Sequence, residues 1–323
     1  MLIPHYWAEG RIHRVADRKS ITVRRHGWSN DSQADAQRHA DQRTEEAFLR
    51  IVDGQPLARR EMKLAYGNEG LPIREEVVAR EHDTVLTRNS YGALCLNTPN
   101  VVFADVDFDL EVPSSWVWAT VLGCVLVTLG AWAMGHSKTA GVLALLTLGA
   151  GHWATLLHRG YIHRKGGHEK KALARVHAFH AQEPEWHLRV YRTPKGLRVL
   201  VLHDTMLPDD PEVLAFFKAI GADPLYVRMC QQQQCFRARV SPKPWRMGIG
   251  QRIRAWNGLT PVDPMRAEER RTWVRSYDQV AEGYASCHWI ETLGTAHRMT
   301  AHTNKVLAMH DALSQAREEL PMA

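Results

Sequence analysis

Residues 116–134 read WVWATVLGCVLVTLGAWAM, and residues 140–157 read AGVLALLTLGAGHWATLL. The first run has no charged residue, the second contains one histidine, and five residues separate the two runs. Because an α-helix rises about 1.5 Å per residue, each run makes a helix of roughly 28 Å, close to the thickness of a bilayer's hydrocarbon core. Neither run has the polar stripe of a surface helix. The sequence therefore predicts a transmembrane helical hairpin over residues 116–158, with a buried hairpin in a soluble core as the alternative.

Aromatic and basic residues flank the two runs in the pattern expected at membrane–water interfaces. The residues predicted to lie at the interface are Trp116, Trp118, Trp153, Arg159, Arg164 and Lys165. The turn between the runs contributes Lys138 alone, so the positive-inside rule places the C-terminal flank, and with it both termini, in the cytoplasm. Small residues such as Gly123 and Gly130 allow close helix packing, so the hairpin also offers a surface for a homo-oligomer.

The composition describes a globular chain outside the hairpin. The chain has 323 residues, of which 45% are hydrophobic and 24% charged, which excludes a disordered chain, a collagen-like fibre and a coiled-coil rod. Five cysteines in a chain of this length exclude a disulfide scaffold and favour reduced, buried thiols.

Charge is distributed unevenly between the two flanks of the hairpin. Residues 1–115 have a net charge of −3, whereas residues 159–323 have a net charge of +8. A basic segment next to a cytoplasmic leaflet favours anionic lipid as its partner. A nucleotide or nucleic acid is the other candidate partner.

Both flanks contain short strand and helix patterns, which predict an α+β fold. We expect a mixed or antiparallel sheet with helices, built from both flanks and interrupted by the two-helix transmembrane hairpin. The predicted parts are residues 1–115 and 159–263 of one cytoplasmic domain, the hairpin at 116–158, and a helical tail at 264–323.

Local patterns predict individual elements on both flanks. Before the hairpin they predict a β-hairpin around the turn at 16–19, a helix from about 29 to 52, strands at 61–66, 84–88 and 101–110, and helical structure at 73–78. After it they predict helices at 169–182 and 209–220 and strands at 185–192, 197–203 and 234–240.

The strand at 101–110, VVFADVDFDL, carries the sharpest candidate site. Alternate side chains of a strand share a face, so Asp105, Asp107 and Asp109 point one way, and Ala104 and Val106 point into a core. Three neighbouring carboxylates repel one another, and a divalent cation such as Mg²⁺ or Mn²⁺ relieves that repulsion. The alternative is a solvated sheet face protected by charge.

A second candidate site lies in the sequence Thr193-Pro194-Lys195-Gly196-Leu197-Arg198. A glycine turn beside Lys195 and Arg198 has the donors that hold a phosphate. An ordinary hairpin turn with solvated cations is the alternative.

These two segments together resemble the palm of archaeo-eukaryotic primases, in which a D-x-D strand is followed by a T-P-x-G turn and a further strand. The resemblance implies a metal-binding role for Asp105 and Asp107. That family has a histidine on the strand after the turn, where this chain has Arg198, with His203 further along. The whole chain also resembles bacterial membrane proteins of unassigned function, which implies a place in the inner membrane and no reaction.

A basic and aromatic cluster follows the strand at 234–240. Its members are Arg237, Arg239, Lys243, Trp245 and Arg246. Arginine and tryptophan stack on bases and bind phosphates, but they also anchor domains to lipid headgroups. The nearby hairpin favours the second role.

The sequence favours a membrane-tethered binding or regulatory module over an enzyme. It contains no G-x-S-x-G, Walker A, H-E-x-x-H or G-x-G-x-x-G motif. The alternative is a divalent-metal-dependent nucleotidyl- or phosphoryl-transfer enzyme with a degenerate primase-like palm, using Asp105 and Asp107 as metal ligands.

Overall fold

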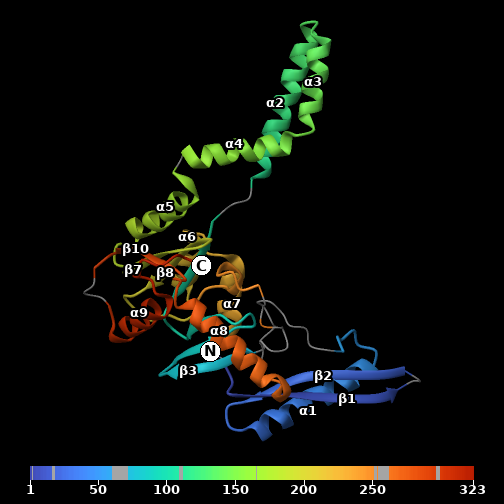
Figure 1. The fold of residues 1–323 in the computed structure, drawn as a ribbon, viewed down its shortest axis with the longest axis vertical. Helices are drawn as coiled ribbons and strands as arrows, with labels where there is room; N and C mark the ends of the chain where they lie inside the picture. The colour runs from blue at the N-terminus through green and yellow to red at the C-terminus, as the bar shows by residue number, and fades with distance from the viewer. Residues whose placement is uncertain are drawn as a thin grey trace.

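The computed structural model describes residues 1, 3–16, 19–59, 72–108, 112–164, 166–250, 253, 262–295 and 299–323. Figure 1 shows a central α+β body, a ββα unit that projects from it near the N-terminus, and an apolar helical arm. The arm emerges from the middle of the chain, between β6 (Phe103–Asp107) and β7 (Leu188–Thr193). The α+β class with antiparallel sheets is as predicted.

The projecting unit consists of the antiparallel strands β1 (Tyr6–Ala16) and β2 (Lys19–Ser29) and helix α1 (Gln33–Val52). This hairpin and helix confirm the predicted N-terminal elements. The Ser32 side chain caps α1 by accepting a hydrogen bond from the backbone N–H of Asp35. Gly10 is required because a Cβ there would lie 2.5 Å from the backbone oxygen of Ala40 on α1.

Two four-stranded antiparallel sheets make the central body. One has the strand order β10–β7–β8–β6 and the other β3–β4–β5–β9. Their remaining strands are β3 (Glu76–Glu81), β4 (Thr84–Arg88), β5 (Leu94–Thr98), β8 (Gly196–Val201), β9 (Phe236–Arg239) and β10 (His288–Leu293). Each sheet joins strands from both flanks of the arm, since β6 pairs with β8 and β5 pairs with β9. Both flanks therefore build one body, as expected, but in two sheets instead of one.

One hydrophobic core connects the two sheets with the helices around them. It contains Leu96 of β5, Phe103 of β6 and Val199 of β8, all fully buried. The helices of the body are α5 (Gly167–Gln182), α6 (Pro211–Ile220), α7 (Pro224–Gln233), α8 (Ala267–Ala281) and α9 (Ala301–Ser314). Helices α5 and α6 contribute Val176 and Phe216 to the same core.

Three local predictions differ from the structure or lie outside it. Residues 76–81 form β3, so the helical structure predicted at 73–78 is wrong. The tail at 264–323 is not wholly helical, because β10 pairs with β7 at the sheet edge. Pairing to a neighbour stabilises these polar strands, and their own sequence carries little periodicity. The strand predicted at 61–66 lies outside the described residues.

The apolar arm contains three helices, α2 (Ser114–Ala133), α3 (Ser137–Thr147) and α4 (Ala150–Arg164). Among the described residues, α2 is the one helix that is long and apolar enough by itself to cross a membrane. Helices α3 and α4 pass the same test only as a pair, and they are bent by 73° at their junction. The single helix predicted at 140–157 is therefore wrong, because the chain breaks at Leu148 and Gly149.

Candidate ligand-binding cavity

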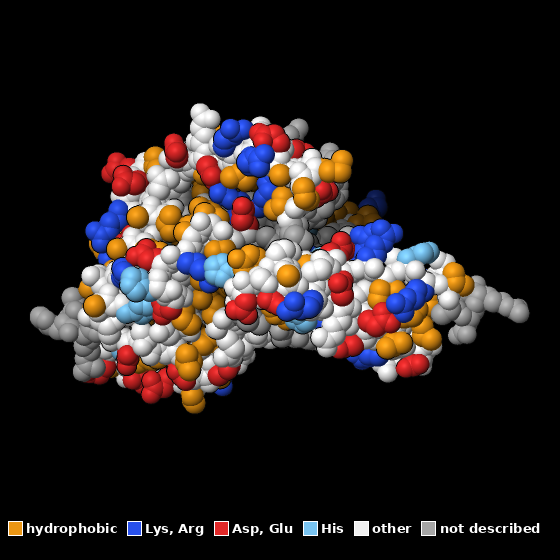
Figure 2. All heavy atoms as spheres, turned by 90° about the horizontal axis from the view of Figure 1, so that it is seen from below, with side chains coloured by type: hydrophobic (Ala, Val, Ile, Leu, Met, Phe, Trp, Pro, Cys, Tyr) orange, Lys and Arg blue, Asp and Glu red, His pale blue; other side chains and the backbone are white. Residues whose placement is uncertain are grey.

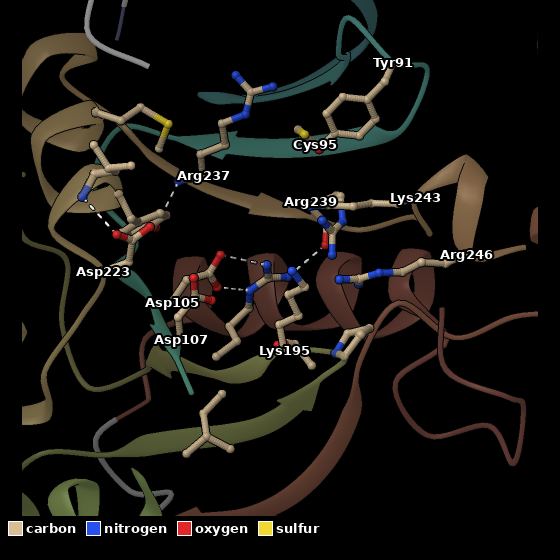
Figure 3. A pocket seen from close by; sticks show the side chains of 17 residues that line it. Tyr91, Cys95, Asp105, Asp107, Lys195, Asp223, Arg237, Arg239, Lys243 and Arg246 are labelled. Carbon is tan, nitrogen blue, oxygen red and sulfur yellow. Dashed lines mark hydrogen bonds and ion pairs between the residues drawn. The ribbon is translucent and has the colours of Figure 1, made fainter. Parts of the chain in front are cut away.

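A cavity of about 290 Å³ opens between the two sheets of the body. Its walls come from the end of β6, the β7–β8 turn, the start of α7, strand β9 and the short 3-10 helix η1 (Pro244–Arg246). Figure 3 shows carboxylates at one end of this cavity and lysine and arginine side chains at the other. The cavity therefore has an acidic end and a basic end.

The acidic end contains Asp105 and Asp107 of β6 and Asp223 at the start of α7. Ala104 and Val106 are buried while Asp105 and Asp107 face the cavity, which confirms the predicted alternation over these four residues. Asp223 is held against β6, because its backbone N–H donates to the carbonyl oxygen of Asp105 at 2.9 Å. Burial raises the pKa of Asp107, and the neighbouring charges of Asp223 and Asp105 raise it further. Asp109 lies outside the described residues.

Asp105 is paired with Arg198, which lies directly opposite it on β8. The Nε of Arg198 donates to Oδ1 of Asp105 at 2.8 Å, and Nη2 donates to Oδ2 at 3.2 Å. Arg198 is only 2% exposed, and its Nη1 donates to the carbonyl oxygen of Arg239 at 2.8 Å. Burial alone would lower the pKa of Arg198, but the charge and hydrogen bonds of Asp105 outweigh burial and raise it. Arg198 is thus the buried counter-ion of Asp105, whereas the sequence predicted a phosphate ligand.

The β7–β8 turn places Lys195 between the two ends of the cavity, because its charge acts both on Asp107 and on Lys243. Gly196 is paired with Asp107 across the strands, and a Cβ at Gly196 would lie 2.1 Å from the carbonyl oxygen of Val106. The turn is fixed further because Phe108 N–H donates to the carbonyl oxygen of Lys195 at 2.9 Å. This close approach explains why the turn contains glycine, and it brings the predicted phosphate-binding Lys195 into the cavity wall.

The basic end is formed by four cations, which we call the cationic cluster. Its members are Lys195, Arg239, Lys243 and Arg246. Burial, together with the charges of Arg239, Arg246 and Lys195, lowers the pKa of Lys243 to about 8. Burial also lowers the pKa of Arg246, again with a contribution from Arg239. Positive charge at this end is therefore not fully compensated by the protein.

Two nitrogen atoms of the cationic cluster are buried without a hydrogen-bond partner among the described residues. They are Nε of Arg239 and Nη1 of Arg246. An unpaired buried donor carries a desolvation cost of about 1–3 kcal/mol, more when it is charged. Such atoms in a cavity wall point to a missing acceptor, and an anion supplies one.

An aromatic side chain, Tyr91, lies next to the cationic cluster. Its ring centre lies 6.0 Å from Nζ of Lys243 and 5.3 Å from the ring centre of Trp245. Tyr91 belongs to the loop between β4 and β5, so both sheets contribute to the cavity. The arrangement places an aromatic ring beside Lys243 in the cavity wall.

The structure brings most of the predicted site residues together. Asp105, Asp107, Lys195 and Arg198 all line the cavity. Arg239, Lys243 and Arg246, for which the sequence favoured lipid headgroups, line it as well. Arg237 also reaches the wall, but it forms an ion pair with Glu75.

Sequence reasoning missed Asp223 and Tyr91 as cavity residues. The segment Gly221-Ala222-Asp223-Pro224 does carry a signal, because aspartate before proline is a helix start, and Asp223 caps α7 by accepting from Leu225 N–H at 3.0 Å. No local pattern indicates Tyr91, since only the packing of the β4–β5 loop places it there.

The predicted membrane-interface residues lie on the arm, away from this cavity. Trp116 packs against His158 and Tyr161 of α4, while Trp118 and Trp153 are exposed. Arg159 and Arg164 are exposed on α4, and Lys165 lies outside the described residues.

No three His, Cys, Asp or Glu side chains within the described ranges converge as a complete set of metal ligands. Asp107 and Asp223 are two carboxylates of one cavity end, and Mg²⁺ in proteins is commonly held by one or two carboxylates plus the phosphates of a ligand. The residues present therefore fit a cation that arrives with a phosphorylated ligand.

Comparisons with protein-family models, with curated proteins and with solved structures find no match to this chain.

Proposed function

We propose that this protein is a module of the bacterial inner membrane whose cytoplasmic α+β domain binds a phosphorylated ligand of the nucleotide class. The observation that carries the proposal is the cationic cluster at one end of the cavity, with its buried unpaired donors and the lowered pKa of Lys243. An internal cluster of this kind is unfavourable in the free protein and becomes favourable when an anion is bound.

The acidic end and Tyr91 restrict the ligand class. The phosphates of a ligand held at the basic end lie in the same cavity as the carboxylates of Asp107 and Asp223. A bound Mg²⁺ or Mn²⁺ would neutralise the negative charge of both the phosphates and the carboxylates. Tyr91 offers a ring for contact with a base or another flat group. The cavity volume of about 290 Å³ is at the lower end of small-molecule sites and suits a single nucleotide better than a nucleic-acid strand.

Direct binding tests the proposal. The detergent-purified full-length chain is titrated calorimetrically with ATP, GTP and inorganic phosphate, each with and without Mn²⁺. We expect saturable binding of at least one nucleotide, stronger than that of phosphate. Absence of binding under every one of these conditions would contradict the proposal.

Proton uptake is expected when the ligand binds at alkaline pH. In the free protein Lys243 loses its charge as the pH rises through about 8, and a bound anion restores the charged form. Calorimetry at a pH slightly above that value, in two buffers of different ionisation enthalpy, should show partial proton uptake per ligand bound. Affinity should fall as the solution is made more alkaline. The Lys243→Met variant should show no uptake; equal uptake in that variant would assign the proton to another group.

A metal-dependent nucleotidyl- or phosphoryl-transfer enzyme is the second candidate function. It is favoured by the pairing of β6 with β8, which places the D-x-D segment beside the strand after the T-P-x-G turn, the two segments that carry the resemblance to a primase palm. The bidentate pairing of Asp105 with Arg198 argues for binding over turnover, because Asp105 must leave Arg198 to ligate a metal ion.

Mn²⁺ should strengthen nucleotide binding through Asp107 and Asp223. We expect an increase in affinity of about 5- to 100-fold, a usual range for coupling between two ligands. Asp107→Asn and Asp223→Asn should each abolish that increase, whereas Asp41→Asn on the exposed face of α1 should retain it. Nucleotide turnover that disappears in Asp105→Asn would favour the enzyme. Nucleotide binding of equal affinity with and without Mn²⁺ would contradict a role for the cation.

The membrane tether is supported by the exposed apolar surface of the arm. Only 6% of the apolar window of α2 is buried, and Leu122, Leu126 and Leu129 are each more than half exposed. By contrast, the face of the molecule turned away from the arm mixes acidic and basic side chains, as Figure 2 shows. Helices exposed to water do not carry this much apolar surface. The surface of the arm is therefore expected to contact lipid or a second copy of the arm.

Reporter fusions test the proposed topology. A fusion at Lys138 should report a periplasmic position and a fusion at Ala323 a cytoplasmic one, as the positive-inside rule predicts for an apolar arm that enters and leaves the membrane on the same side. The opposite pattern, or recovery of the protein in the soluble fraction after lysis, would contradict the tether.

A further inference from the structure

The bend between α3 and α4 points to a surface on α4 that the predicted two-span hairpin does not contain. Helix α3 has 11 residues, which at about 1.5 Å per residue makes it roughly 16 Å long, about half of a bilayer's hydrocarbon core. The chain then turns by 73° into α4. Figure 1 shows α4 running across the base of the α2–α3 pair instead of alongside it.

Packing against α2 holds α4 in this direction. The ring centres of Trp116 and His158 are 5.4 Å apart, and those of Trp116 and Tyr161 are 5.3 Å apart. Ala154, His158 and Ile162, spaced four residues apart, are the buried side of α4. Because Trp116 belongs to the first turn of α2, α4 lies at the level where α2 would leave the bilayer.

The rest of α4 is divided between an apolar and a polar side. Trp153, Leu157 and Tyr161 lie on one exposed stripe at four-residue spacing and are 44%, 57% and 46% exposed. His152, Arg159 and His163, all exposed, lie on a different side at spacings of seven and four residues. The separation is incomplete, because Leu156, 45% exposed, borders this polar side and Arg164, in the last turn, lies on the apolar stripe. A helix with an exposed apolar stripe, an aromatic residue and a basic side has the composition of helices that lie in a membrane interface.

We propose that α4 is an in-plane interfacial helix that docks on the cytoplasmic leaflet, with the stripe Trp153–Leu157–Tyr161 at the acyl boundary and its cations among anionic headgroups. The bilayer is chosen as the partner for two reasons. The apolar surface continues along the chain from α3 through Leu148, which is 86% exposed, and the exposed Arg159 and Arg164 carry positive charge that matches anionic lipid. The inference rests on the proposed membrane tether and is independent of the ligand cavity.

Depth measurements on the full-length chain in nanodiscs test this inference. The cysteines outside the arm are buried, and Cys124→Ala removes the one on α2. Single cysteines are introduced as Trp153→Cys, Leu157→Cys and Gly160→Cys and carry a fluorophore; a side chain at Gly160 meets no atom within 4 Å. Quenching by lipids with shallow or deep spin labels then gives the depth of each position.

An in-plane helix and a spanning helix predict different depths. Between positions 153 and 160 a helix along the membrane normal descends about 10 Å. If α3 runs along the normal, α4, which is bent by 73° from α3, descends only about 3 Å. We expect similar, shallow depths at all three positions, and iodide quenching of a label at Arg159→Cys, the matched position on the polar side. A depth difference near the larger of these two values would overturn the in-plane helix while retaining the tether.

Two further outcomes separate the parts of the proposal. Absence of quenching by any lipid label would overturn both the tether and the in-plane helix, even in a protein that still binds its ligand. In discs of neutral lipid the α4 labels should become more accessible to iodide than in anionic discs, and equal accessibility would overturn the headgroup contact.

Discussion

Replacing Lys243 with methionine is expected to weaken binding of the phosphorylated ligand by about 10- to 100-fold, because a hydrogen bond to a charged group contributes about 1.5–3 kcal/mol. Lys243 lies in the cationic cluster beside Tyr91, with Arg239 and Arg246 as further donors. The effect should appear as a loss of affinity at constant stoichiometry, measured by calorimetry with the full-length chain.

The same substitution should leave the thermal midpoint unchanged or raise it. Because burial and neighbouring cations lower the pKa of Lys243 to about 8, the folded state below that pH carries a charge that its surroundings disfavour. The folded state therefore gains stability as the pH rises between about 8 and 10.5, the ordinary lysine value, and a methionine at this position removes the unfavourable charge at every pH.

Lys218→Met is the matched control, because Lys218 is exposed on α6 and does not line the cavity. It should alter neither affinity nor stability by more than a small amount. A loss of affinity in Lys243→Met that comes with an equal loss in stability would instead assign Lys243 a structural role. If Lys243→Met binds the phosphorylated ligand with unchanged affinity, the cationic cluster is not the ligand site.

Replacing Asp105, whose side chain is 33% exposed, with asparagine is expected to destabilise the body by about 3–5 kcal/mol, the usual cost of leaving a buried charge, here that of Arg198, without its partner. Arg198 is 2% exposed and keeps its charge, and its other hydrogen-bond partners among the described residues are the Arg239 carbonyl and His310. For a domain of this size the thermal midpoint should fall by about 6–20 °C, measured by circular dichroism in detergent.

A double replacement separates the cost of the unpaired charge from the loss of packing. In Asp105→Leu with Arg198→Met no charge remains, so the double variant should recover more than half of the stability that Asp105→Asn loses. Asp41→Asn on α1 is the control for the change of residue type, with no expected effect. If the double variant is as unstable as Asp105→Asn, the unpaired charge of Arg198 is not the main cost. The loss of stability would then come from the lost hydrogen bonds of the pair, including the one from Arg198 to the Arg239 carbonyl oxygen.

This ion pair also bears on the choice between the two candidate functions. A metal-dependent enzyme needs Asp105 as a free carboxylate, whereas a binding module uses Asp105 to hold Arg198 and β9 in place. Retained nucleotide binding in the stable double variant would favour the module.

Several features of this protein follow from local sequence alone. The alternation of Ala104, Asp105, Val106 and Asp107 predicts which side chains face a core, because strand geometry has a period of two. The helix start at Pro211 is visible from its capping chemistry, and the start of α1 is predicted to within a few residues, at about 29, whereas its N-cap is Ser32. The first apolar run predicts α2, since its length and composition leave no polar face.

Other features depend on contacts between distant segments, and the tertiary structure alone decides them. Nothing near Arg198 indicates that it neutralises Asp105, because the pair forms only when β8 aligns with β6 across the inserted arm. The sequence likewise favoured lipid headgroups as the partner of Arg239, Lys243 and Arg246. In the structure β9 pairs with β5, and these three side chains line the cavity instead. The bend into α4 arises from the packing of Trp116 on His158 and Tyr161. Local sequence specifies periodicity and capping, which act over a few residues; charge partners, cavities and bends depend on which surfaces meet after folding.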